Sequence, residues 1–259
     1  MTPEKFFSAL CLITAIAISV TLLMTPRRCF AADADELAPE LLDAARAASR
    51  IAGVALPSLL AQLAHESAFR ANARNAASSA SGPAQFLETT WLEMIQRHGA
   101  AYGLASAAEQ IVSINGRLDI ADAKLKAKVL ALRQDPHLAV AMAGRYLAAV
   151  GDDLARLLGR APSEIEIRVG YLFGAGGAAQ LLKAARATPK ASAAEILPDA
   201  AKANPTLFRD AAGRTLGAAD CLASIRSALG HDAAPAGRAD PEPVPENLVD
   251  PVLAPADAG

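Results

Sequence analysis

The amino-acid sequence predicts a mainly α fold with at most a short β-hairpin and with disordered tails. Apolar residues recur at helical spacing along most of the chain, and much of its 53% hydrophobic content is alanine, which favours closely packed helices. No alternating apolar pattern indicates a long strand, so we expect any strands to be brief. Residues 231–259 are rich in Pro, Ala and acidic residues, a composition typical of a disordered tail.

Residues 1–34 predict either a signal peptide or an N-terminal anchor. Lys5 precedes an uncharged run over residues 6–24, close to the ~20 residues that span a bilayer. Residues 32–34 or residues 29–31 offer a cleavage site, and cleavage would give a periplasmic or secreted protein. Without cleavage, the run would anchor the protein in the inner membrane. Both alternatives stay open, and in the second the N-terminal segment is the only contact with the membrane.

The rest of the chain is predicted as one domain over residues 35–230, with a core at 37–187 and C-terminal helices at 188–230. Either Thr89 or Thr90 is expected to cap one of the core helices, and Asn115-Gly116 is a turn signal. The predicted core helices cover residues 37–52, 57–69, 90–98, 106–113, 121–132, a long helix from Pro136, a helix from Ser163 to a turn at 174–177, and 178–187. Short helices are predicted over residues 191–196, 205–208 and 218–229.

Charge and cysteine content exclude some classes of function. The formal net charge of −2 gives no reason to expect nucleic acid. Cys11 and Cys29 lie in or near the leader, so Cys221 is the one cysteine securely in the mature chain and no internal disulfide is expected. The histidines, which include His65, His98 and His137, lack the spacing of zinc ligands, and we expect neither a metal nor a cofactor.

Glu66 is the anomaly around which the chain is organised. Leu59, Leu63 and Glu66 share one face of the helix that Pro57 opens, so a carboxyl group lies on the side that should meet the core. Partial burial raises the pKa of a glutamic acid, which makes it a proton donor at neutral pH. The alternative is a structural role, in which the carboxylate pairs with Arg70 or Arg74 or caps a backbone group.

Four short motifs accompany this acid: Glu-Ser at 66–67, Gly-Pro-Ala-Gln-Phe at 82–86, Thr-Thr-Trp at 89–91 and Gly-Tyr-Leu-Phe-Gly at 170–174. Together they resemble the soluble lytic transglycosylase family, over roughly residues 37–187. The resemblance implies a lysozyme-like helical domain of the goose-type or transglycosylase kind. In this sequence Pro83 and Ala84 replace the usual Leu-Met pair, and Leu172 stands where the family has asparagine.

The resemblance also implies the site and the reaction. Glu66 would be the catalytic acid, and Tyr171 would orient it. The substrate-binding residues would be Ser67, Ser78, Gln85, Phe86, Tyr146 and Tyr171. The substrate would be the glycan strand of peptidoglycan, cleaved between N-acetylmuramic acid (MurNAc) and N-acetylglucosamine (GlcNAc) with formation of a 1,6-anhydro end. An envelope-spanning secretion or motility complex is a further expected partner.

Two alternatives stay open. A hydrolytic muramidase would use a second carboxylate, for which Glu88 and Glu93 are the nearby candidates, although Glu88 is better explained as a first-turn residue of its helix. A non-catalytic peptidoglycan-binding protein would keep the fold without the chemistry, and Leu172 is the residue that keeps this alternative open.

Overall fold

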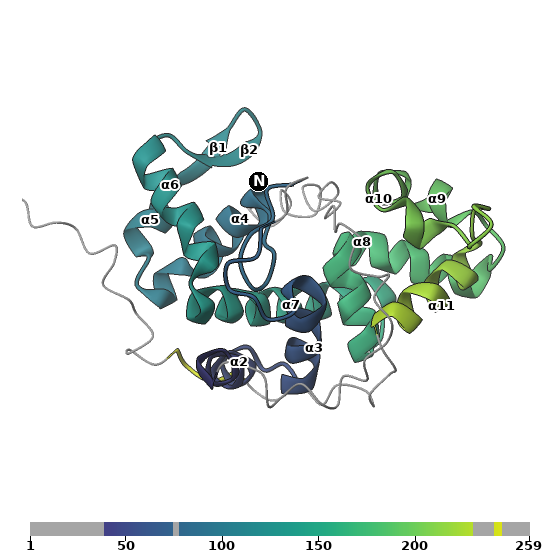
Figure 1. Ribbon diagram of the computed structural model, residues 1–259, viewed down its shortest axis with the longest axis horizontal. Coiled ribbons are helices and arrows are strands. Elements are labelled where there is room, and N and C mark those ends of the chain that lie inside the picture. The colour runs from purple at the N-terminus through teal and green to yellow at the C-terminus, as the bar shows by residue number, and fades with distance from the viewer. Residues whose placement is uncertain (1–38, 75–77, 230–240, 245–259) are drawn as a thin grey trace, which may run out of the picture. The chain divides into compact units, whose positions relative to one another are not determined.

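The computed structural model describes residues 39–74, 78–229 and 241–244, and this part of the chain is mainly helical, as predicted (Figure 1). Its described residues divide into two compact units, the first holding residues 39–146 together with 241–244 and the second holding residues 147–229. The predicted leader, the two outer boundaries of the predicted domain and most of the tail lie outside the described residues. No helix in the described ranges is long and apolar enough to span a membrane.

The first unit holds most of the predicted site. Its elements are α2 (Pro39–Ala52), α3 (Leu56–Ser67), α4 (Glu88–His98), η4 (Gly99–Tyr102), α5 (Ala105–Glu109), β1 (Ile111–Ile114), β2 (Arg117–Ile120), α6 (Ala123–Ala131), η5 (Leu132–Gln134) and the first half of α7 (Pro136–Leu158). Helix α4 packs against α5, α6 and β2. Helices α2 and α7 approach each other closely at Gly144: a Cβ atom added there would lie 3.2 Å from the Ala48 carbonyl oxygen.

Helix α4 begins earlier than the threonines predict. Its N-cap is Leu87, so Glu88 is its first residue and neither Thr89 nor Thr90 caps it. The Oγ atom of Ser79, from the preceding loop, accepts from the Glu88 backbone N–H at 3.3 Å. A side chain distant along the chain therefore supplies the oxygen expected from a local cap, and the prediction of a threonine cap was wrong.

The helix predicted over residues 106–113 is also wrong in its second half. Helix α5 ends at Glu109, and β1 pairs antiparallel with β2 with Ile111 opposite Ile120. Asn115 and Gly116 both have positive φ, at 53° and 78°, as a two-residue type I′ hairpin turn requires. The turn at Asn115-Gly116 is confirmed, but it joins two strands and not two helices.

The second unit is built on α8 (Glu164–Ala187), which packs along α11 (Ala218–Leu229). Ser163 opens α8 with a capping box that Glu166 completes, as its position before the helix suggests. Only Gly174 leaves helical geometry (φ 70°, ψ 159°), so the predicted turn over 174–177 is a one-residue kink. The remaining elements are α9 (Ala193–Ile196), α10 (Pro198–Ala203), which was not predicted, and η6 (Pro205–Phe208).

Candidate active site

The Glu66 carboxyl group lies at the end of α3, partly exposed, on a helix whose Leu59 and Leu63 are buried as predicted. One turn earlier, the side chain of Gln62 is 0% exposed, and its Nε2 donates to Glu66 Oε1 at 2.7 Å. The carboxyl group is therefore held by an amide that water does not reach. Gln62 was missed in the sequence, although its position four residues before Glu66 puts it on the same face.

The backbone that follows Glu66 is strained. Ala68 caps α3 in the left-handed conformation (φ 49°), and Phe69 follows it with φ 63°. Gln85 adopts the same region with φ 48°. The one other non-glycine residue with positive φ among the described ranges is Asn115, in the hairpin turn. Such conformations cost energy and gather at functional sites, so their concentration here marks the segment as a candidate site.

Ser67 joins the end of α3 to the turn formed by residues 82–85. Its side chain is 1% exposed, and Oγ donates to the Pro83 carbonyl at 2.8 Å, with the Leu63 carbonyl as a longer alternative at 3.3 Å. Predicted as a substrate contact, Ser67 instead has its hydroxyl group inside the protein. It fixes the turn beside Glu66.

Gln85 closes the same loop. Its Nε2 donates to the Gly82 carbonyl at 2.8 Å and to the Ala73 carbonyl at 3.1 Å, so both amide hydrogens are used within the loop. The amide oxygen of Gln85 accepts no hydrogen bond from a described residue. Because Gln85 is partly exposed, this oxygen is the part of the side chain that suits a ligand hydroxyl or N–H group.

Gly82 is where the loop meets η5. Its φ is 81°, and an added Cβ atom would lie 1.7 Å from the Arg133 carbonyl oxygen. Real Cβ atoms do not approach backbone so closely, so only glycine fits. The Gly-x-x-Gln spacing therefore has a local physical reason: glycine permits backbone contact with η5, and glutamine three residues later binds the glycine carbonyl.

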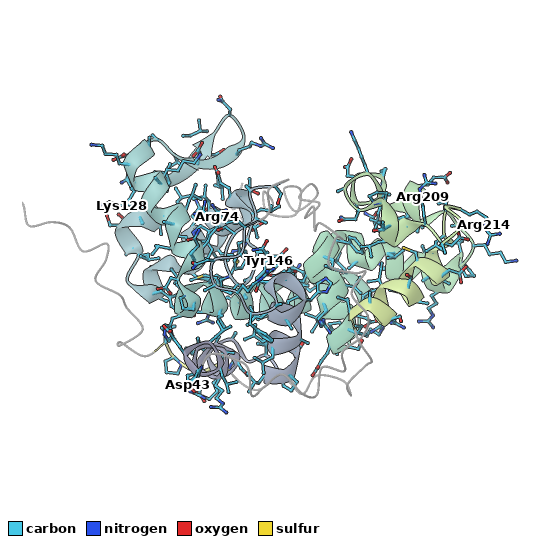
Figure 2. All side chains as sticks on the ribbon, viewed as in Figure 1. Asp43, Arg74, Lys128, Tyr146, Arg209 and Arg214 are labelled. Carbon is cyan, nitrogen blue, oxygen red and sulfur yellow. The ribbon has the colours of Figure 1, made fainter. Side chains whose placement is uncertain are left out.

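Three aromatic side chains pack together next to the turn at residues 82–85. The Phe86 ring lies 5.5 Å from the Trp91 ring and 6.2 Å from the Tyr146 ring, the latter edge to face at 73°. Trp91 is fully buried and its Nε1 donates to the Val129 carbonyl at 2.7 Å. Phe86, predicted as a substrate contact, is buried in the core. Tyr146, which is labelled in Figure 2, is partly exposed.

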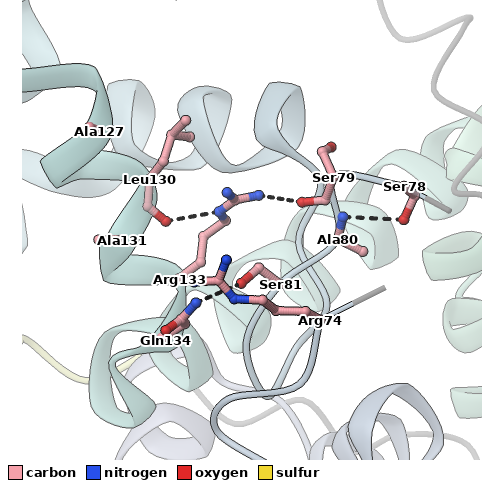
Figure 3. A pocket seen from close by; sticks show the side chains of 10 residues that line it. All are labelled: Arg74, Ser78, Ser79, Ala80, Ser81, Ala127, Leu130, Ala131, Arg133 and Gln134. Atoms are coloured by element: carbon pink, nitrogen blue, oxygen red, sulfur yellow. Dashed lines mark hydrogen bonds between the residues drawn. The ribbon is translucent and has the colours of Figure 1, made fainter. Parts of the chain in front are cut away.

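Ser78 lines a hollow of about 370 Å³, the arginine pocket, beside this loop (Figure 3). Its Oγ accepts from the Ala80 backbone N–H at 3.2 Å. The pocket is lined by Arg74, Ser78, Ser79, Ala80, Ser81, Ala127, Leu130, Ala131, Arg133 and Gln134. Burial is the main cause that lowers the pKa of Arg133; Glu88 opposes this shift, and the positive charge of Arg74 adds to it.

Tyr171 lies in the second unit, in α8, where it is 2% exposed. Leu172 beside it is buried too. The expectation that the Tyr171 hydroxyl orients Glu66 stays a prediction. Among the predicted site residues, the first unit thus brings together Glu66, Ser67, Gln85, Phe86 and Tyr146 around the turn at 82–86, with Ser78 on the neighbouring loop.

The two other carboxylates near the motifs are engaged in ion pairs. Glu88 lies 2.7 Å from Lys126 Nζ, and Glu93 lies 2.9 Å from Arg97 Nη2. Glu88 is the first residue of α4, in agreement with the preferred explanation of its role. Within the described ranges, no three His, Cys, Asp or Glu side chains are grouped as metal ligands.

These contacts place the Glu66 carboxyl group, at the end of α3, beside the turn at residues 82–85, where Gly82 cannot be replaced without a clash. No protein-family model matches this chain.

Proposed function

We propose that this protein is a peptidoglycan lytic transglycosylase that cleaves the MurNAc-β-1,4-GlcNAc bond and leaves a 1,6-anhydro-MurNAc end. The observation that carries the proposal is the contact of Gln62 with Glu66, at 2.7 Å from a fully buried amide to a partly exposed carboxyl group. A carboxyl group that a buried amide holds in place, and that is partly exposed to solvent, is suited to donate a proton to a bound sugar.

The contact also suggests which oxygen reacts. Because Gln62 donates to Oε1, that oxygen must be an acceptor, and the proton of the acid belongs on Oε2. In the first step Glu66 Oε2 protonates the leaving glycosidic oxygen while the acetamido oxygen of MurNAc stabilises the developing positive charge. In the second step the Glu66 carboxylate takes the proton of the sugar's hydroxymethyl group, and the ring closes without water.

One carboxyl group can serve both steps because they follow one another. A hydrolytic muramidase commonly needs a second carboxylate to act on water or on the sugar. The ion pairs of Glu88 with Lys126 and of Glu93 with Arg97 leave Glu66 as the better candidate and favour the lyase. The proposal also requires export, since the substrate lies outside the inner membrane. The protein would be periplasmic, secreted or anchored there, and could serve a secretion or motility complex.

The test is wall digestion by the full chain and by two matched variants. Glu66→Gln should abolish release of muropeptides, because the amide cannot donate and then accept the same proton. Glu93→Gln makes the same change of charge in α4 and should leave release unchanged. A wild-type protein that binds peptidoglycan but releases nothing would be a binding protein, and a Glu66→Gln variant with full activity would exclude Glu66 as the acid.

A further inference from the structure

The arginine pocket holds two positive charges without a carboxylate partner among the described residues. Arg133 is partly buried; its Nε donates to the Leu130 carbonyl at 2.9 Å and its Nη1 to the Ser79 carbonyl at 2.6 Å. Arg74 lies beside it (Figure 3), close enough that its charge contributes to the lowered pKa of Arg133. Neither guanidinium group forms a salt bridge with an acidic side chain in the described ranges. The hydrogen-bond partners of both groups are thus neutral, and the Glu88 carboxylate, itself paired with Lys126, offsets part of the positive charge at Arg133.

The side-chain groups that remain available in the pocket are donors. The carbonyl oxygen of Gln134, in the amide orientation that satisfies both groups, accepts from Arg74 Nε at 3.1 Å and Nη2 at 2.7 Å, which leaves Arg74 Nη1 open. The Oγ atoms of Ser78 and Ser79 accept backbone N–H groups, so each hydroxyl proton can be donated elsewhere. Guanidinium and hydroxyl donors together match an oxyanion.

The size of the pocket favours an organic anion. A volume of about 370 Å³ corresponds to roughly twelve water molecules at ~30 Å³ each, more than a single inorganic ion needs. The other lining side chains include those of Ala127, Leu130 and Ala131, which are small or apolar. They leave room for the atoms that carry a carboxylate.

The pocket and Glu66 flank the same turn. Ser67, next to Glu66, binds the Pro83 carbonyl, while Arg133 Nη1 binds the Phe86 carbonyl at 3.2 Å and the Arg133 carbonyl abuts Gly82. An extended peptide attached to a sugar beside Glu66 advances ~3.3–3.6 Å per residue, so each added residue extends its reach along this turn by that amount.

We propose that the arginine pocket binds a free carboxylate of the peptide attached to the glycan strand. The assignment to this peptide rests on the proposed function, whereas the oxyanion chemistry follows from the donors alone. The pocket would then make the protein prefer peptide-bearing strands over bare glycan.

The test measures binding to the full chain carrying Glu66→Gln, so that the charge of the Glu66 carboxylate does not contribute to the comparison of the probes. One probe is an N-acetylmuramoyl dipeptide with free carboxylates, and the second is the same compound with its carboxylates converted to amides. A charge-assisted hydrogen bond contributes enough that the acid should bind about tenfold more tightly than the amide. Adding Arg74→Gln should remove this tenfold difference. Adding Lys128→Gln, an exposed change of the same charge on α6 outside the pocket, should preserve it (Figure 2).

Equal affinities for acid and amide would overturn the inference, as would a difference that survives Arg74→Gln. Binding of inorganic phosphate without binding of the dipeptide would overturn the peptide assignment. Arg133→Lys keeps the positive charge but loses the paired N–H donors of the guanidinium group, so it should reduce the preference for the acid probe. Trp91 fluorescence checks that this variant folds.

Cleavage separates this inference from the proposed function. If the wild-type chain cleaves nothing yet binds the dipeptide through Arg74, the proposed function fails and the pocket stands. If it cleaves bare and peptide-bearing strands at equal rates that Arg74→Gln does not change, the pocket inference fails and the function stands.

Discussion

Gly82→Ala should destabilise the first unit far more than an ordinary glycine replacement does. A non-glycine residue in the left-handed region costs about 1–2 kcal/mol. The added Cβ atom would also lie 1.7 Å from the Arg133 carbonyl oxygen, so the turn must move away from η5. That movement endangers the bonds from Gly82 N–H to the Ala73 carbonyl (2.9 Å) and from Gln85 Nε2 to the Gly82 carbonyl (2.8 Å). At about 1 kcal/mol for each bond, the total loss is about 3–4 kcal/mol.

Gly116→Ala is the matched control. Gly116 has nearly the same φ, 78°, but a Cβ atom there meets nothing within 4 Å. Only the conformational cost of about 1–2 kcal/mol then applies, so the two variants should differ by about 2 kcal/mol. Urea unfolding followed by Trp91, the one tryptophan in the chain, reports the first unit. With a slope of ~1–3 kcal/mol per molar urea, the midpoints should differ by about 1 M. Equal midpoints would refute the close approach of Gly82 to Arg133.

Three further predictions concern buried polar groups. Ser67→Ala leaves the Pro83 carbonyl without its donor and should cost about 1–3 kcal/mol in Trp91-detected unfolding; an unchanged midpoint would contradict the buried contact. Burial, with Arg145 and Arg97, lowers the pKa of His98 from 6.5 to about 4. The unfolded chain therefore binds its proton first, and stability should fall as pH drops from about 6.5 towards 4, by up to about 1.4 kcal/mol per pH unit. His98→Gln should flatten that part of the pH curve, and an unaltered curve would exclude His98. Arg160 holds the pKa of Glu166 below the ordinary value for glutamate. The ion pair therefore stabilises the fold at pH values above that ordinary pKa, and this stabilisation is lost as the pH falls through the lowered pKa. Glu166→Gln should cost about 2 kcal/mol at neutral pH in circular dichroism melts and nothing in strong acid; a constant difference would refute the ion pair.

Helical periodicity and local start signals predicted those helices whose residues lie a few positions apart in the sequence. The apolar face of α3 and the Ser163 start of α8 follow from residues a few positions apart, and both are confirmed. The prediction of a helix at Ile111–Ile114 was wrong because apolar residues three positions apart fit a short strand as well as a helix. The Asn115-Gly116 turn, with positive φ at both residues, joins the two strands as a hairpin and so favours strand over helix in this segment.

The sequence indicated where Glu66 lies on its helix, but not the contacts that surround it. Glu66 was expected on the apolar side of its helix, and the structure places it there beside Gln62. Ser67 and Phe86 were expected to face substrate, but tertiary packing buries both. The approach of Gly82 to Arg133 joins residues about fifty positions apart, and no local pattern records such a contact.

The most direct test of the proposed chemistry is digestion of peptidoglycan in water labelled with heavy oxygen, followed by mass spectrometry of the products. If Glu66 acts alone as acid and then base, every new MurNAc end is an anhydro ring that carries no label. Labelled reducing ends would show that water attacks the sugar, and the transglycosylase proposal would be wrong.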